Sequence, residues 1–519
     1  MERVRDAMEA EAAEFKEISP ADFFYRNRDI AGFSNPVRST YMAIRELIEN
    51  SLDACEETGI LPDLYIRVAI TKKENERETI ELSVSDNGKG IPPQIVPNAF
   101  GQVLFGSKYT LKQSRGTFGL GGKMAYLYGQ ITTNEPLEVV TGNGKIAHDF
   151  RLMIDISQNK PIILSKKQIR LKRKWRGTKV TFSFEGNYTR AGSKVIEYIS
   201  ETAMVAPYAN ITFVDPEGKM YRFTRTTTKM PRPPRVTLPH PKGIDVETLQ
   251  RMIAVTRRRD LVSFLSGEFE RVGKQTATKV IKAFDLKNKD PKLLTHEEMV
   301  QLAKYLLSYD AFLPPDPSAL SPLGKELFEE GIRKELNPEF VSAESRKPSS
   351  YSGHPFIIEV GIAYGGDIVP EGKIKLYRFA NRIPLLYDEY SDVSWKIVGG
   401  EINWRRYRLT PENDPLAIFV HVCSTKVPYK TVGKEYIADR PEIEHEMING
   451  IRNVARDLAV YLSRRRRITY EKKRLDVFER YLPVIAKYAS KVARVRQVPD
   501  VEVLVKKAKK LPLTVKETE

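Results

Sequence analysis

The sequence predicts an α+β protein with several domains, and three observations carry this prediction. At 519 residues the chain is too long for one core, which predicts roughly three or four domains. Apolar residues recur at helical spacing in some segments and alternate with polar residues in others, so both helices and strands are expected. Proline clusters at 231–234 and 314–322 mark two boundaries between domains.

The charge balance favours a polyanionic partner. Hydrophobic residues make up 41% of the chain and charged residues 29%, which is a globular composition. The net charge is +17, and the isoelectric point is ≈ 9.4. Such an excess attracts DNA or RNA over long range. The alternative is a Lys/Glu/Arg-rich surface of the kind that heat-adapted proteins carry.

The sequence indicates neither a membrane span nor a secretory signal. No stretch approaches the ~18 uncharged apolar residues that a bilayer requires. Residues 1–15 form a predicted charged helix without the apolar centre of a signal peptide, so a cytoplasmic location is expected. Cys55 and Cys423 lie far apart in sequence, which argues against a disulfide framework or a zinc cluster and predicts two buried free thiols.

The first 230 residues mix helices and strands. Ser19, followed by Pro20 and by Asp22 three residues on, has the pattern of a helix start. A helix is predicted from Tyr41 to Glu57 because apolar residues recur there at helical spacing. Strands are predicted at residues 64–70, 80–84, 137–156 and 178–184.

The remainder alternates between helical and mixed segments. Residues 239–310 predict short helices only, with glycines in the turns. Strands return at 356–364, 373–379 and 416–423. From Pro441 onward the pattern is helical and basic, and it includes four consecutive arginines at 464–467.

The first candidate site segment lies on the predicted helix from Tyr41 to Glu57. Glu46 and Asn50 are four residues apart and therefore share a helix face, with Asp53 one turn further on. A carboxylate beside an amide oxygen is typical of a site that activates water and binds Mg²⁺. A solvated helix face with no chemistry is the alternative for this pair alone.

A second segment follows the predicted strand at 80–84. Asp86 at the strand end can accept a hydrogen bond from the exocyclic amine of adenine, while Gly88 and Gly90 let the backbone turn sharply. An ordinary Asp-Gly turn is the alternative.

The third segment is rich in glycine and leads into a helix, so that its backbone amides can hold phosphates. It is no Walker A loop, because Met124 stands where Ser or Thr is required. Ser107 and Lys108 upstream can add a hydroxyl and a cation, and Thr178 after Gly177 forms a fourth segment. The glycine segment itself comprises Gly116, Thr117, Phe118, Gly119, Leu120, Gly121, Gly122 and Lys123.

The order of these four segments resembles the GHKL (Bergerat) ATPase superfamily of gyrase, heat-shock chaperones, histidine kinases and MutL-type mismatch-repair proteins. Residues 18–62, with SPADFFYRNRDIAGFSNP and RELIENSLDACEETGILP, closely resemble the B subunits of type IIB topoisomerases (topoisomerase VI). The resemblance continues through VSDNGKGIP, FGSKY and RGTFGLGGK, and it resumes at residues 424–435, STKVPYKTVGKE.

The resemblance implies roles for individual residues. Glu46 matches the family's general base, Asn50 its magnesium ligand and Asp86 its adenine contact. Lys434 matches the lysine that reaches the γ-phosphate from another domain, and Lys430, expected one helical turn away, is the fallback. The segments with Ser107, Lys108 and 116–123 match the lid around the phosphates of ATP. One departure is the second glycine of the Gly121-Gly122 pair, where a branched residue is more usual, so a looser lid is expected.

The resemblance also implies the domain order. Residues 1–230 correspond to a Bergerat-type ATPase α/β sandwich with an N-terminal strap, and 231–312 to a small helix–two-turns–helix domain. Residues 313–467 correspond to a βαβ transducer domain, and 468–519 to a basic helical C-terminal tail. Residues 271–274 either contact a DNA phosphate or form a packing turn. The tail docks a partner subunit, lies along DNA or is simply solvated.

The implied function is that of an ATP-driven dimerisation gate for double-stranded DNA. A partner A subunit would supply the catalytic tyrosine and the acidic metal site, since this chain has no Asp-x-Asp. The implied A2B2 heterotetramer would pass one duplex through another, relaxing supercoils and decatenating DNA, with the strap reaching over the neighbouring protomer. A chaperone or mismatch-repair ATPase and a histidine kinase are the rival interpretations.

Overall fold

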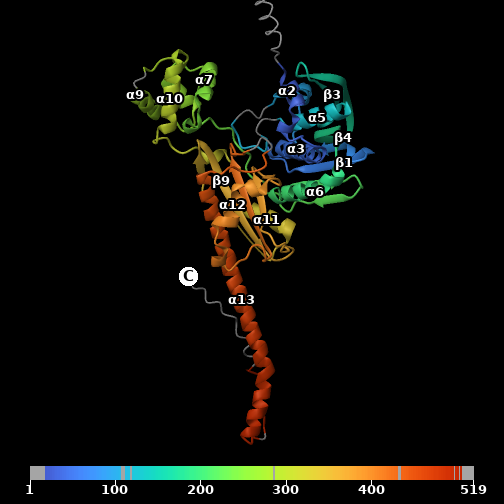
Figure 1. The fold of residues 1–519 in the computed structure, drawn as a ribbon, viewed down its shortest axis with the longest axis vertical. Coiled ribbons are helices and arrows are strands. Elements are labelled where there is room, and N and C mark those ends of the chain that lie inside the picture. Colours follow the sequence, from blue (N-terminus) through green and yellow to red (C-terminus); the bar gives the residue numbers. More distant parts are fainter. Residues whose placement is uncertain are drawn as a thin grey trace, which may run out of the picture.

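The computed structural model describes residues 18–106, 111–116, 120–284, 287–430, 434–495, 497–501 and 503–504. Two mixed sheets, a separate group of short helices and one long C-terminal helix make up this part of the chain (Figure 1). None of its helices is long and apolar enough to cross a bilayer.

The first sheet has six strands in the order β3-β4-β2-β1-β5-β6. Neighbours pair antiparallel except β1 and β5, which run parallel. Burial alternates along β1 and β2, so one face of the sheet packs on helices and the other faces solvent. The strands are β1 (Asp63–Glu74), β2 (Arg77–Ser85), β3 (Leu137–Asp155), β4 (Lys160–Gly186), β5 (Asn210–Val214) and β6 (Met220–Phe223).

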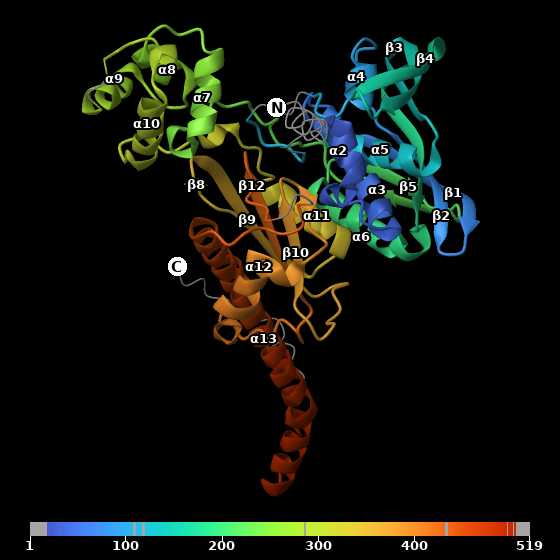
Figure 2. The same ribbon diagram turned by 45° about the horizontal axis from the view of Figure 1, so that its top comes forward.

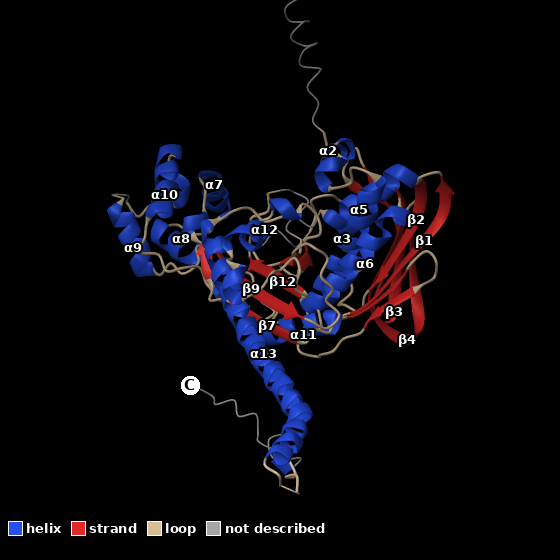
Figure 3. Cartoon of the chain, turned by 60° about the horizontal axis from the view of Figure 1, so that its bottom comes forward, coloured by secondary structure: helices blue, strands red, loops and turns tan. Residues whose placement is uncertain are grey.

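Helices gather on the inner face of this sheet (Figure 3). The three long helices there are α3 (Pro36–Glu56), α5 (Gly121–Thr133) and α6 (Tyr188–Val205), with α2 (Pro20–Arg26) and α4 (Val96–Gly101) beside them. Ser19 caps α2 by accepting from the Asp22 amide, as the sequence predicts. Asn35 caps α3, which therefore starts one turn earlier than predicted.

Short helices form a separate group with its own core, at the upper left of Figure 1. They are α7 (Val246–Val255), α8 (Leu261–Glu268), α9 (Lys274–Ala283) and α10 (His296–Ser308). Phe264, Leu249, Val280 and Leu302 are buried against one another there. This cluster of buried residues is separate from the core beneath the two sheets.

The second sheet has the order β11-β10-β12-β9-β7, with β8 paired to β9. β10 and β12 run parallel and are joined through α12, which gives the expected βαβ unit. The elements are α11 (Lys325–Leu336), β7 (Phe340–Ser345), β8 (Ser349–Tyr351), β9 (His354–Tyr364), β10 (Lys375–Ala380), β11 (Ile383–Pro384), α12 (Val393–Lys396) and β12 (Leu416–Ser424). Figure 2 shows this sheet beside α6, and one core continues from α6 through α11 into it.

The last element, α13 (Pro441–Val492), is a single helix of 52 residues. At 1.5 Å per residue it is roughly 78 Å long. Its first half packs on the second sheet through Ile443, Met447, Val454 and Leu458, whereas the second half projects away (Figure 1). The boundary predicted between 467 and 468 therefore falls inside a continuous helix, because a helical pattern does not reveal where packing ends.

The sequence missed several strands and misjudged one segment. β5, β6, β7, β8 and β11 were not predicted, and β4 begins well before residue 178. The described residues around Lys430 are not helical: Tyr429 pairs with Ile437 in an isolated bridge, and Lys434 has φ 55°. Neither lysine therefore has the helical backbone expected of a shared turn, and residues 431–433 lie outside the described part. The residues before Ile18 lie outside the described part.

Candidate functional site: α3, the start of α5 and the end of β2

Helix α3 carries the first candidate group into the core. It packs against α5, α6 and the sheet, and most of its residues are buried. Glu46 is only 6% exposed although its side chain ends in a carboxyl group. Burial of a carboxylate in such a place is costly unless polar partners or a ligand compensate it, which makes a purely solvated helix face untenable for Glu46.

The N-terminus of α5 lies directly on Glu46 and Asn50. A Cβ added to Gly121 would collide with the Glu46 carboxylate, and one added to Gly122 would lie 2.9 Å from Asn50 Nδ2. A side chain at either position would displace the end of the Glu46 or Asn50 side chain, so both side chains lie against the first turn of α5. The looser lid expected from the Gly121-Gly122 pair stays a prediction, because residues 117–119 lie outside the described part.

Asp86 forms the opposite wall of the site. Its Oδ1 accepts the amides of Gly88 at 2.9 Å and Thr178 at 3.3 Å, and Ser51 also bonds to the carboxylate. Burial outweighs these hydrogen bonds and raises the pKa of Asp86 to about 6. The carboxyl is thus incompletely compensated by the protein and is prepared to accept a further donor.

Glycines allow the chain to close around Asp86. Gly90 has φ +70°, and a Cβ there would lie 2.8 Å from the Gly142 carbonyl oxygen. Gly177 has φ +130°, and a Cβ there would overlap the Asp86 carbonyl oxygen. These backbone conformations favour glycine. The structure thus brings Asp86, Gly88 and Gly90, which follow β2, together with Thr178, which lies within β4.

Lys434 reaches this region from the second sheet. Its Nζ donates to the Arg115 carbonyl oxygen at 3.0 Å and lies 3.7 Å from Glu49 Oε2 on α3. Lys430, by contrast, lies 3.7 Å from Asp439 and is largely exposed. The structure therefore favours Lys434 over Lys430 as the residue that faces the pocket.

Several expected residues cannot be placed. Ser107, Lys108, Thr117, Phe118 and Gly119 lie outside the described residues. On either side of the latter three, the Gly116 carbonyl accepts from the Ser114 hydroxyl at 2.6 Å, and Leu120 precedes α5 as its N-cap.

Lys123 and Asp53 each have a partner within the protein. Lys123 is buried, donates to the Phe105 carbonyl, and has a pKa lowered to about 8 by burial. Arg115 Nη1 donates to Asp53 Oδ1 at 2.9 Å, which turns this carboxylate toward the segment before α5.

Sequence reasoning missed a buried cluster beside the site. Arg115 forms a two-pronged ion pair with Glu56 of α3, at 2.7 Å for both contacts, and Arg382 of the second sheet lies 3.2 Å from the same carboxylate. Glu49 was also missed, and it accepts from Arg45 at 2.7 Å. The only signal was the position of Arg115 at the start of the glycine segment, because Arg382 lies far away in sequence.

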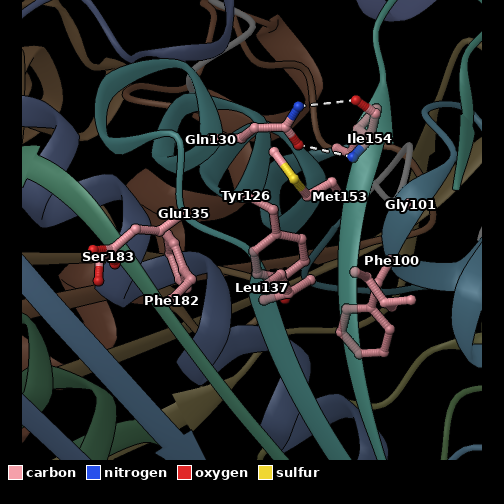
Figure 4. A pocket seen from close by; sticks show the side chains of 11 residues that line it. Phe100, Gly101, Tyr126, Gln130, Glu135, Leu137, Met153, Ile154, Phe182 and Ser183 are labelled. Atoms are coloured by element: carbon pink, nitrogen blue, oxygen red, sulfur yellow. Dashed lines mark hydrogen bonds between the residues drawn. The ribbon is translucent and has the colours of Figure 1, made fainter. Parts of the chain in front are cut away.

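A small cavity behind α5 is not the nucleotide site. It measures ≈ 10 Å³ and lies between α5, β3 and β4 (Figure 4). Gln130 closes one side by bonding both the amide and the carbonyl of Ile154. A cavity of this size holds at most about one water molecule.

The second sheet buries Glu359, His421 and Cys423 in a group with metal-ligand chemistry. His421 Nε2 accepts from the Arg382 amide at 2.9 Å, so Nδ1 carries the proton and donates to Glu359 at 2.9 Å. Glu359 also accepts from the amides of Leu323 and Gly324. Because these donors already use the ring nitrogens and the carboxylate, the group does not fit a metal ion. Cys55 is likewise buried, so both thiols are free and buried, as predicted.

Comparisons with known proteins agree with the resemblance. Residues 37–185 match the family described as histidine kinase-, DNA gyrase B-, and HSP90-like ATPase, and residues 315–474 match the topoisomerase VI B subunit transducer. A solved structure, the 43K ATPase domain of Thermus thermophilus gyrase B in complex with an aminocoumarin, has 14% identity and a TM-score of 0.39, covering 91% of this chain and 97% of that chain.

Two curated relatives are much more similar. The B subunit of type 2 DNA topoisomerase 6 from Metallosphaera sedula is 46% identical over 480 residues, covering 92% of this chain and 90% of that protein. The corresponding protein of Sulfurisphaera tokodaii is 45% identical over 477 residues, covering 91% and 89%. Identity along nearly the whole length excludes the chaperone, mismatch-repair and histidine-kinase interpretations. The chain therefore belongs to the topoisomerase VI B-subunit family, the ATPase subunits of ATP-dependent type IIB DNA topoisomerases.

Proposed function

We propose that the site formed by α3, the start of α5 and the end of β2 binds and hydrolyses ATP, and that Lys434 reports the nucleotide state to the second sheet. The position of Lys434 carries this proposal. Its ammonium group comes from the loop after β12, yet it contacts the segment that precedes α5. A cation there can both neutralise phosphate charge and sense whether a γ-phosphate is present.

Asp86 is proposed to bind adenine. Its carboxylate is buried, and burial raises its pKa in spite of the hydrogen bonds from Gly88, Thr178 and Ser51. The exocyclic amine of adenine would supply a further donor, while the glycines at 88 and 90 leave room for the base. Thr178, whose amide already bonds Asp86, fixes the carboxylate in this position.

Glu46 is proposed as the general base and Asn50 as the Mg²⁺ ligand. The start of α5 presents backbone amides beside both side chains, which is the usual setting for phosphates. The amide oxygen of Asn50 is a hard donor that fits Mg²⁺, which when bound supplies charge neutralisation on the phosphates. Glu46 accepts a proton from the attacking water.

Domains beyond the pocket would turn ATP binding into gating. We propose that residues 231–312 form the helix–two-turns–helix domain, 313–467 the transducer and 468–519 the tail. We also propose that the chain dimerises through its ATPase domain when ATP is bound, with the segment before Ile18 as the strap. The second half of α13 supports docking to the A subunit in an A2B2 assembly. Apolar side chains three or four residues apart are exposed there, namely Val477, Phe478, Tyr481, Val484, Ile485 and Tyr488.

Double-stranded DNA is the proposed substrate of that assembly, in which the A subunit cleaves one duplex and this chain gates the passage of another. Exposed basic side chains crowd β4, which supports contact with phosphates. They are Lys166, Lys167, Arg170, Lys172, Arg173, Lys174 and Arg176. Arg271 donates to the Pro314 carbonyl, and this contact favours the packing-turn interpretation of Arg271. Lys274 is exposed, so it can contact DNA in this proposal. A DNA substrate accords with the cytoplasmic location expected from the sequence.

The Glu46→Ala variant tests the proposal. We expect ATP hydrolysis to fall by about 10²–10⁴, because a general base acts in the chemical step. ATP binding, measured by calorimetry, and ATP-dependent dimerisation, measured by light scattering, should remain near wild type. Glu74→Ala, at an exposed carboxylate on β1, is the matched control. Loss of ATP binding in Glu46→Ala would make Glu46 a binding or structural residue instead.

A further inference from the structure

A two-residue turn of the second sheet enters the interface with the ATPase domain. Asn381 and Arg382 connect β10 to β11, and both have positive φ, at 47° and 65°. Neither is a glycine, so both side chains are retained at a backbone conformation that disfavours them. Both residues are 6% exposed, and each is held in place by the adjacent strand β12.

Asn381 connects β12 to the segment before α5. Its amide accepts from the Ser424 backbone N–H at 2.9 Å and donates to the Ser424 carbonyl at 2.9 Å. The same Nδ2 donates to the Ser114 carbonyl at 3.1 Å. One side chain thereby joins two pieces of backbone that are more than 300 positions apart in sequence.

Arg382 connects the same turn to helix α3. Its Nη2 lies 3.2 Å from Glu56 Oε2, and its Nη1 donates to the Tyr208 hydroxyl at 3.4 Å. Tyr208 in turn donates to Glu56 Oε1 at 2.7 Å. Burial alone would raise the pKa of Glu56, but the guanidinium groups of Arg115 and Arg382 outweigh it and hold the pKa below its ordinary value. Glu56 is therefore charged and shared by both arginines.

The segment 111–116 is consequently fixed on both sides. Arg115 binds Glu56 and Asp53 of α3, while the Gln113 side chain exchanges two hydrogen bonds with the Ser321 backbone, at 2.7 and 3.2 Å. Lys434 donates to the Arg115 carbonyl. Lys434 is the member of this set that the proposed function assigns to the γ-phosphate.

We propose that Asn381 and Arg382 form a nucleotide-independent tether, a pair of positioning residues that hold the segment 111–116 and the end of α3 on the transducer. This inference rests on the proposed ATP site, because the segment 111–116 leads into its glycine-rich part. The contacts involve protein groups only, so they persist when Lys434 exchanges partners. Lys434 then changes the angle between the domains around a junction that does not separate.

Removal of Arg382 should not unfold the ATPase domain. Arg115 alone meets both oxygens of Glu56 in a parallel, two-pronged geometry, so no buried carboxylate is left unpaired. Arg382→Met keeps the apolar stem and deletes the charge. Arg346→Met is a matched control, because Arg346 also pairs with two carboxylates, Glu344 and Glu446, but lies wholly on the second-sheet side.

The test is a distance measurement between spin labels on the full chain. One label is attached at Glu217→Cys, in the turn between β5 and β6, and the other at Val369→Cys, after β9. They report on the first-sheet side and the second-sheet side of the junction. Both native cysteines are buried. Without nucleotide we expect a narrow distance distribution in the wild type and in Arg346→Met, and one about twice as wide in Arg382→Met. A non-hydrolysable ATP analogue should narrow it again through Lys434. A narrow distribution in Arg382→Met, or an equally broad one in Arg346→Met, overturns the proposal.

Steady-state kinetics provides a second readout. In Arg382→Met the KM for ATP should rise about tenfold, a usual size for coupling between sites, while kcat changes by less than about threefold. Arg382→Lys should recover the low KM only in part, because an ammonium group cannot bond Glu56 and Tyr208 as the planar guanidinium does. A fall in kcat with an unchanged KM in Arg382→Met would contradict a positioning role. If the wild type binds no ATP, the proposed ATP site is wrong. The label distances measured without nucleotide still test the proposed tether in that case.

Discussion

Asp86, beside the first sheet, and Glu359, in the second sheet, are two buried carboxylates. They differ in how far hydrogen bonds compensate the cost of their burial. Glu359 accepts from His421, Ser345 and two backbone amides, so both of its oxygens are satisfied. Burial alone would raise its pKa, but these donors lower it below the ordinary value. Asp86 has fewer donors, and burial raises its pKa to about 6.

The difference separates a structural carboxylate from one that we propose to bind a ligand. A fully satisfied buried charge fixes the parts around it: Glu359 ties the start of α11 to β9 and β12. An incompletely satisfied charge is costly for the folded protein and persists where a ligand completes its hydrogen bonds. The second sheet thus contributes mainly structure to the ATP site, with Lys434 as its proposed exception.

The largest expected effect concerns that exception. Lys434→Ala should slow ATP hydrolysis by about 10²–10³, because removal of one charge-stabilising donor typically costs this much. It should also abolish the difference between the solution-scattering profiles with a non-hydrolysable ATP analogue and with ADP. Arginine at 434 should not restore full activity, since its planar fork differs from a compact ammonium group.

Lys430→Ala is the matched control for Lys434→Ala, because Lys430 lies four residues away and faces Asp439 instead of the pocket. It should keep wild-type hydrolysis and the wild-type scattering change. Normal hydrolysis and normal scattering in Lys434→Ala would make the second sheet purely structural.

The next effect concerns Glu359. Glu359→Gln replaces one carboxylate oxygen, which accepts hydrogen bonds, by an NH₂ group that faces other donors. We therefore expect the free energy of unfolding, measured with urea, to fall by about 3 kcal/mol. The folded fraction should bind ATP with wild-type affinity, because the change lies away from the pocket. Full stability in this variant would remove the contrast between the two carboxylates.

The smallest effect concerns Asp86. Asp86→Asn should weaken ATP binding about tenfold, because the amide can turn its NH₂ toward the adenine amine and a hydrogen bond to a charged group is lost. Stability should be kept or slightly raised, because a costly buried charge is removed. Calorimetric titration with ATP and urea unfolding of the same sample measure both quantities. Unchanged binding would move the adenine pocket elsewhere.

The pH dependence gives Asp86 an internal check. Its pKa in the folded protein, about 6, lies above the ordinary 3.8, so its contribution to stability is present below 3.8 and is lost as pH rises through 6. ATP affinity should change in the opposite direction and fall as the carboxylate is protonated below about pH 6. In Asp86→Asn both dependences should disappear. A wild-type affinity that stays constant between pH 5 and 7, a window of about one unit on either side of this pKa, would contradict a charged adenine acceptor.

The local elements around the proposed ATP site follow from short-range signals in the sequence. The N-cap at Ser19, the helical spacing around Glu46 and the strand before Asp86 depend on neighbours within a few residues, and each is found where predicted, apart from shifted ends. The buried free thiols also followed from composition and separation. Family motifs, rather than propensities, brought Lys434 into consideration, and its role and those of the other site residues remain predictions.

Contacts between groups that are distant in sequence depend on the assembled fold. Arg382 and Glu56 are more than 300 positions apart, and no local pattern marks a buried ion pair between them. The contact of the Glu46 carboxylate with Gly121 depends on how α5 lies against α3, and the end of packing along α13 depends on where the second sheet stops. Local propensities act over a few residues, whereas burial, charge compensation and close contact are properties of the assembled fold. The candidate site residues could therefore be predicted from the sequence, whereas the contacts between the domains became visible only in the folded structure.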